Sequence, residues 1–196
     1  MNPGKSQLIV FTKCFRHKAE MEKNAFSVKL FGQDVFTSLE AVFLGVTFDQ
    51  RMTWEPQYRK LAVRAYKRLN LIRRIRSLAK EPNPNILAHL YQSLIIPVFE
   101  YSSLCIINAA EVHIEKLQLI QNMALRAIMG CPKYISTSDL HDCTGFLPIK
   151  DHLISFARKR LDSMQKNSPL VARPIHQYGL VRHIIANKSP LDVIYS

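Results

Sequence analysis

The chain has 196 residues, and 27 Lys and Arg against 15 Asp and Glu give it a formal net charge of +12. This length is typical of one domain, or of one domain with part of another. With 47% hydrophobic and 21% charged residues, the composition excludes a disordered or fibrous chain. The longest apolar run, residues 94–99, is far shorter than the roughly twenty residues of a membrane-spanning helix. We therefore expect no membrane partner.

The first fifty residues have the pattern of short strands. Gly45 lies within one apolar run, where it indicates a bulge or a close backbone approach. Three or four such strands with one apolar face bury little surface by themselves, so we expect part of a larger sheet or a sheet that packs on helices. The predicted strands are residues 7–12, residues 27–31 and 35–37 around a Gly32-Gln33 turn, and residues 42–48.

From Thr53 the hydrophobic period changes to that of α-helices. Apolar residues recur every three or four positions, and Pro, Gly and capping residues bound each segment. The predicted helices run from Thr53 to the Pro-rich residues 81–84, over about 85–107 with a break at Pro97, over about 111–129 before Gly130, over 139–143 with Ser138 as cap, and from 151 to about 166.

These elements predict an α+β fold, in which a small antiparallel sheet remnant precedes a mainly α-helical bundle. We divide the chain into a β segment at residues 1–52 and a helical region at residues 53–166. Residues 167–196 hold three prolines and no sustained period, so we expect a loosely ordered tail there.

The positive charge is concentrated in the first predicted helix. Residues 55–80 hold nine bases against one acid, Glu55, and so carry +8 of the total of +12. Bases along one helix face are suited to contact successive phosphates, and Tyr58 and Tyr66 could add stacking. A merely solvated face would balance bases with acids. We predict that the bases opposite the apolar stripe bind nucleic acid: Arg59, Lys60, Arg64, Lys67 and Arg74.

A second basic group lies on the last predicted helix, whose outer face carries Arg158, Lys159 and Arg160. No catalytic motif accompanies either group. The chain has no adjacent pair of acidic residues, no Gly-rich phosphate loop and no Gly-x-Ser-x-Gly nucleophile turn. We therefore predict a binding module and assign no catalytic residue.

Cysteine and histidine give no strong metal signal. The four cysteines are far apart and form no Cys-x-x-Cys pair, which favours free thiols in a reducing compartment, nuclear or cytoplasmic. The nearest approach to a zinc set lacks the paired ligand spacing of structural sites, and we expect no metal site in it. Its members are Cys131, His141, Cys143 and His152.

A series of short segments resembles, in the same order, parts of reverse transcriptases from non-LTR retrotransposons, jockey-like elements especially. The resemblance covers roughly residues 1–165 and departs from the family at Phe43, where Tyr is usual, and at Gln57, where His is usual. The matching segments lie at residues 2–6 (Asn-Pro-Gly-Lys-Ser), 9–12, 43–49 (Phe-Leu-Gly-Val-x-x-Asp), 52–56, 91–101, 121–126, 140–141 and 145–149.

The resemblance implies a palm segment up to Asp49 and, from Trp54, a thumb-like region that holds a template–primer duplex. It places Phe43, Leu44, Gly45 and Val46 near the primer end. In the family the catalytic carboxylates lie upstream of the segment matched at residues 2–6. The resemblance therefore implies no catalytic residue here, and Mg²⁺ only for the complete polymerase.

We interpret the chain as a C-terminal fragment of such a polymerase, inactive alone, that binds template–primer nucleic acid through the basic helix. The implied partners are an RNA template or RNA/DNA hybrid and the rest of the polymerase. Two alternatives stay open at this point: a helical protein-interaction module that docks through its apolar sheet face and second helix, and a non-functional truncated gene product.

Overall fold

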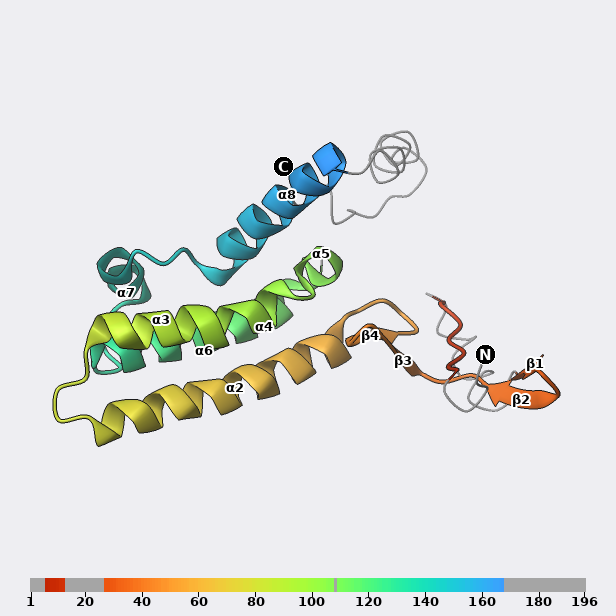
Figure 1. Ribbon diagram of the computed structural model, residues 1–196, viewed down its shortest axis with the longest axis horizontal. Coiled ribbons are helices and arrows are strands. Elements are labelled where there is room, and N and C mark those ends of the chain that lie inside the picture. The colour runs from red at the N-terminus through yellow and green to blue at the C-terminus, as the bar shows by residue number, and fades with distance from the viewer. Residues whose placement is uncertain (1–5, 13–26, 108, 168–196) are drawn as a thin grey trace. The chain divides into compact units, whose positions relative to one another are not determined.

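A computed structural model describes residues 6–12, 27–107 and 109–167 of the chain (Figure 1). The chain forms two compact units, Met1–Lys60 and Leu61–Ser196. Strand pairs precede helices along the described chain, so the fold is α+β, as predicted. The expected loose tail lies outside the described residues except for Asn167, and so does most of the segment at residues 2–6.

Two antiparallel β-hairpins make up the strands of the first unit. Each closes on two residues with positive φ, Phe31-Gly32 in the first hairpin and Leu44-Gly45 in the second. Turns of this kind match the twist of the paired strands. The first hairpin confirms the predicted pairing, with its turn one residue earlier than expected. The pairs are β1 (Ser27–Leu30) with β2 (Gln33–Phe36), and β3 (Glu40–Phe43) with β4 (Val46–Asp49).

Two predictions for this unit are wrong. Residues 42–48 are not one strand with a bulge, because Gly45 (φ 77°) and Leu44 (φ 47°) turn the chain between β3 and β4. The run is apolar throughout and lacks the polar residues that usually mark a turn. Residues 7–12 form no strand either. Among the described residues they make one isolated parallel bridge, between Leu8 and Thr37.

Asp49 links β4 to the helix that follows, α2 (Glu55–Leu78). Its Oδ1 accepts a hydrogen bond from the Trp54 amide at 2.9 Å, and its Oδ2 accepts one from the Thr53 amide at 3.0 Å. Gln57, where the family has His, is buried, and its Oε1 accepts from the Thr47 amide at 2.9 Å. These side chains satisfy backbone donors that neither strand pairing nor the helix can satisfy.

The second unit is helical, and α6 lies at its centre with contacts to α3, α7 and α8. Its core is a set of large apolar side chains that are almost completely buried, among them Leu69, Ile72, Phe99, Leu117 and Ile120. The helices after α2 are α3 (Pro84–Leu94), α4 (Ile96–Glu100), α5 (Ser103–Ile106), α6 (Glu111–Met129), α7 (Thr137–Thr144) and α8 (Ile149–Asn167).

The helix boundaries follow local capping chemistry. The break predicted from Pro97 is found two residues earlier, at Ile95, with Pro97 in the first turn of α4. A second break at residues 101–102 divides the segment into α3, α4 and α5. Gly130 ends α6, as predicted, and has a left-handed conformation. The predicted cap of α7 is wrong: Ser136, not Ser138, accepts from the Asp139 amide, at 3.1 Å, so α7 begins earlier. No helix in the described ranges is long and apolar enough to cross a membrane.

Candidate nucleic-acid interface

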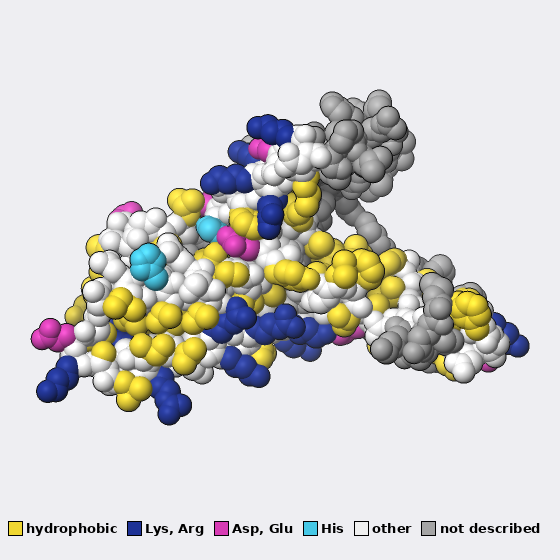
Figure 2. Space-filling view, viewed as in Figure 1, with side chains coloured by type: hydrophobic (Ala, Val, Ile, Leu, Met, Phe, Trp, Pro, Cys, Tyr) yellow, Lys and Arg dark blue, Asp and Glu magenta, His cyan; other side chains and the backbone are white. Residues whose placement is uncertain are grey.

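The outward surface of α2 is basic, and Figure 2 shows Lys and Arg side chains gathered along this helix. Its inward surface holds Leu61, Ala65, Leu69 and Ile72, all buried. Residues of α2 up to Lys60 belong to the first unit and the others to the second. All five bases predicted to face outward are exposed: Arg59, Lys60, Arg64, Lys67 and Arg74.

In the first unit, two of these bases already have partners. Arg59 Nη2 lies 2.8 Å from Glu55 Oε1, and both side chains are more than half exposed (71% and 51%). An ion pair so exposed contributes little to stability and is easily exchanged for another anion. Lys60 donates from Nζ to Thr47 Oγ1 at 2.8 Å. An ammonium carries three donors, so Lys60 still has two to offer.

In the second unit, Arg64, Lys67 and Arg74 have no hydrogen-bond or ion-pair partner in the part of the chain that the structure describes. They lie three and seven residues apart, a spacing that keeps them on one line of the helix surface. At 1.5 Å of rise per residue, that line is about 15 Å long. The three charges are therefore free to meet an extended anion.

The two tyrosines predicted to stack on nucleobases differ in their exposure to solvent. Tyr66 is exposed, as stacking requires, but Tyr58 is only 2% exposed and belongs to the core. The apolar stripe that predicted the buried face of α2 already contains Tyr58, and its burial follows from that position. Stacking is thus restricted to Tyr66.

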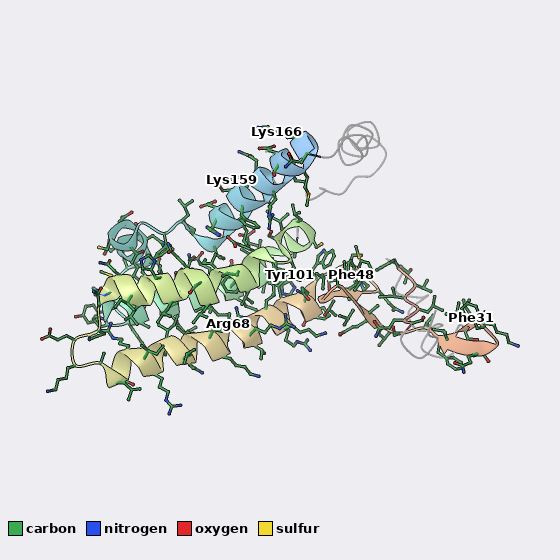
Figure 3. All side chains as sticks on the ribbon, viewed as in Figure 1. Phe31, Phe48, Arg68, Tyr101, Lys159 and Lys166 are labelled. Atoms are coloured by element: carbon green, nitrogen blue, oxygen red, sulfur yellow. The ribbon has the colours of Figure 1, made fainter. Side chains whose placement is uncertain are left out.

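Two further arginines of α2 serve the fold. Arg68 lies on the side of α2 towards α3 (Figure 3), and its Nη1 donates to the Leu94 carbonyl at the end of that helix. Arg76 Nη1 donates to the carbonyls of Ala127 and Ile128, each at 2.9 Å. These carbonyls end α6, where they have no helical partner and where the helix dipole favours a positive charge.

The predicted primer-proximal residues form the turn between β3 and β4. Phe43 and Leu44 are 67% and 74% exposed, whereas Val46, just after Gly45, is buried. Beside them, the first unit has a shallow pocket with a volume of about 390 Å³. Most of its lining is apolar, and it consists of Gln7, Ile9, Phe11, Ala41, Val42, Phe43 and Phe48.

Three of the segments that resemble the polymerase family meet where α6, α7 and α8 join. Gln118 is the centre of this junction: its Oε1 accepts from the Ile149 amide at 2.8 Å, and its Nε2 donates to Asn122 Oδ1 at 2.8 Å. The same Nε2 is 3.1 Å from His141 Nε2. Gln121 donates to the Leu147 carbonyl at 2.9 Å. These segments therefore hold helices together.

His141 has a defined role in this junction. Its Nδ1 lies 2.7 Å from the Phe146 carbonyl, which requires a hydrogen on Nδ1, so Nε2 accepts from Gln118. Gln118 lies outside the segments that resemble the family, and sequence reasoning missed it. The available signal was an amide side chain on the inward side of α6, one residue after the buried Leu117.

No metal site is found in the described residues. His141 uses both ring nitrogens, and His152 Nε2 lies 2.9 Å from Glu100 Oε1. No group of three or more His, Cys, Asp or Glu that could hold a metal ion occurs in these ranges. Burial raises the pKa of the Cys105 thiol, which makes it a poor nucleophile. The property of the α2 surface that can support binding is therefore its positive charge.

Comparison with known proteins confirms the resemblance. The chain is 24% identical over 173 residues to the probable RNA-directed DNA polymerase from transposon BS of Drosophila melanogaster (88% of this chain, 18% of that protein). It is 24% identical over 142 residues to the RNA-directed DNA polymerase from mobile element jockey of Drosophila melanogaster (71% and 15%). A jockey polymerase of Drosophila funebris is 25% identical over 167 residues (83% and 17%).

The chain is thus homologous to RNA-directed DNA polymerases of non-LTR retrotransposons, at low identity. It spans less than a fifth of the length of the curated relatives that it matches. No protein-family model and no solved structure matches it.

Proposed function

We propose that this chain acts as the part of a retrotransposon RNA-directed DNA polymerase that grips template–primer nucleic acid, with α2 as the contacting element. One observation carries the proposal. Arg68 and Arg76 have protein partners, whereas Arg64, Lys67 and Arg74 lie on one outward line without any in the described residues. If acidic residues were interleaved with these bases, the helix surface would have no net electrostatic attraction for a polyanion.

Binding of this kind reads the backbone and not the base sequence. Each base that meets a phosphate releases a condensed counterion, so affinity falls as the salt concentration rises. In the first unit, Arg59 and Lys60 offer further phosphate contacts by exchanging or sharing their present partners. Tyr66 adds a ring that stacks on any base or sugar. The ligand is an RNA template or an RNA/DNA hybrid.

The first unit supplies a second part of the proposal. The exposed turn residues Phe43 and Leu44 lie near the primer end, and the rest of the polymerase brings the catalytic carboxylates and their Mg²⁺. Exposed aromatic side chains at Phe31, Phe36 and Phe43 are suited to dock against that remainder. The chain alone then binds nucleic acid and does not extend a primer.

The test is charge reversal with a matched control. The variant Arg64→Glu/Lys67→Glu/Arg74→Glu removes the outward line, and the control Lys29→Glu/Lys116→Glu/Lys133→Glu makes the same change in net charge at exposed sites elsewhere. Affinity for a 20-base-pair RNA/DNA hybrid is measured over a range of salt concentrations. We expect the slope of log K against log salt to fall in magnitude by about 2 to 3 in the α2 variant only.

An equal loss in both variants would mean attraction to net charge and would overturn α2 as the site. A binding curve that ignores salt would overturn the whole proposal.

The same exposed aromatic residues favour a second candidate function, a protein-interaction module. Persistent self-association of the chain at high salt, with no binding to the hybrid, supports that candidate over the first.

A further inference from the structure

The last helix carries a basic group to which the proposed function gives no role. Among the bases of α8, Lys150 pairs with Glu111 at 2.9 Å. Lys159, Arg160 and Lys166 are exposed and have no acidic partner in the ranges that the structure describes. Figure 2 shows Lys and Arg side chains over α8 as well as over α2.

The geometry of α8 presents these charges outward. Leu153, Ala157 and Leu161 form the buried side of the helix. Lys159 and Lys166 are seven residues apart, which places them on one face about 10.5 Å apart along the axis. Figure 3 shows both projecting from the side of α8 away from α5.

Arg160 is held in place by an aromatic ring. Its guanidinium carbon lies 5.5 Å from the centre of the Phe156 ring, a cation–π contact. Such a contact leaves the guanidinium its positive charge, and its N–H donors have no hydrogen-bond partner in the described residues. Those donors have the geometry that binds phosphate oxygens in pairs. Arg160 is therefore ordered without being neutralised.

The character of this face favours phosphate over protein. Between Lys159 and Lys166 the exposed residues besides Arg160 are Asp162, Ser163 and Met164, so this face has a single exposed apolar side chain, 42% exposed, and one acid. Protein interfaces need apolar or aromatic anchors and are depleted in Lys. Contacts with a nucleic-acid backbone come from Lys, Arg and Ser side chains of this kind.

This face is separate from that of α2. α8 packs against α4, α5 and α6, and its first residues are held near the N-terminal half of α6 by Lys150–Glu111 and Ile149–Gln118. The end of α2 is held at the other end of α6, where Arg76 binds the last carbonyls. Within the second unit, α2 and α8 therefore attach to α6 at opposite ends (Figure 1).

We propose that α8 is a second phosphate-binding surface, formed by Lys159, Arg160 and Lys166, and that one long nucleic acid engages α2 and α8 together. The second half of this statement rests on the proposed function of α2. A short ligand reaches one surface only. A long one gains affinity because its second contact is intramolecular.

The experiment uses the full chain and RNA/DNA hybrids in a length series from 8 to 40 base pairs. Lys159→Gln/Arg160→Gln/Lys166→Gln neutralises the α8 face, and Lys29→Gln/Lys116→Gln/Lys133→Gln is the matched control. Circular dichroism checks that each variant is folded. On the longest hybrids we expect the α8 variant to lower the magnitude of the salt slope by about 2 to 3, and the gain in affinity with length to disappear.

The outcomes separate the two proposals. An unchanged slope and unchanged length dependence in the α8 variant, with binding lost in the α2 variant, overturns the second surface alone. Loss in the α8 variant with none in the α2 variant overturns the proposed function of α2 and retains the α8 surface. Equally tight binding to poly-glutamate, tested as a polyanion without phosphate, overturns nucleic acid as the partner of α8.

Discussion

Two groups of bases on α2 differ in what surrounds them. Arg68 and Arg76 give their guanidinium groups to backbone carbonyls at the ends of α3 and α6, while Arg64, Lys67 and Arg74 have no partner in the described residues. Each of these five bases adds the same +1 to a net-charge count. Only the second group is available to a ligand, so position relative to the apolar stripe separates the bases that stabilise the fold from those that we propose to bind nucleic acid.

The largest effect that this comparison predicts is on stability, at Arg76. In Arg76→Met, the hydrocarbon chain is retained, but the carbonyls of Ala127 and Ile128 lose a charged donor. We expect the free energy of unfolding to fall by about 2 to 3 kcal/mol, measured by urea denaturation. The salt slope of nucleic-acid binding by the folded protein should stay the same, because Arg76 faces inward.

The matched change two residues earlier, Arg74→Met, should do the reverse. Arg74 is exposed and has no partner in the described residues, so stability should change by less than about 0.5 kcal/mol. The magnitude of the salt slope should fall by about 1, as for one lost phosphate contact. If both variants lose stability equally, the division of α2 into two groups is wrong.

A smaller effect tests how closely Arg76 approaches the end of α6. Gly130 has φ 72°, and an alanine Cβ there would overlap Arg76 Nη2 and lie 2.9 Å from Cζ. Gly145 has a similar φ of 68°, but nothing lies within 4 Å of its Cβ position. Gly145→Ala therefore reports backbone strain alone, at about 1 kcal/mol, and Gly130→Ala should cost about 2 kcal/mol in urea denaturation.

The double variant isolates the cause of the difference. In an Arg76→Met background, the cost of Gly130→Ala should fall towards that of Gly145→Ala, because the clashing guanidinium is gone. Additive costs would mean that Arg76 does not crowd Gly130.

Local signals account for the parts of the fold that could be predicted. The bounds of α6 and its end at Gly130 follow from period and capping within one stretch of chain. The β3–β4 hairpin could not be predicted in this way, because Leu44-Gly45 turns inside an apolar run without the usual polar turn residues. At α7, Ser136 and Ser138 are both plausible caps, and only the structure shows which one accepts.

In the candidate site, too, local features could be predicted from the sequence and long-range contacts could not. A helical wheel predicts that Arg64, Lys67 and Arg74 are exposed, since exposure depends on the helix to which they belong. The carbonyls bound by Arg76 are 51 and 52 residues away, and Gln118 reaches Ile149 across 31 residues. Such partners are set by tertiary packing, for which a single sequence has no local signal.

The smallest predicted effect is a pH dependence of stability that comes from the buried phenol of Tyr91. Tyr91 is buried in α3 with its ring 5.1 Å from that of Phe146, and burial raises the pKa of its phenol while the neighbouring Gln121 lowers it less. A pKa above that of the unfolded chain means that the folded state prefers the neutral phenol. Its contribution is complete below about pH 10 and is lost as the pH rises above that value. Wild type should therefore lose stability more steeply than Tyr91→Phe between pH 10 and 11, in urea denaturation at matched ionic strength. Parallel curves would mean that the phenol is hydrated in the folded state, and that the core which Arg68 and Arg76 border is open to water.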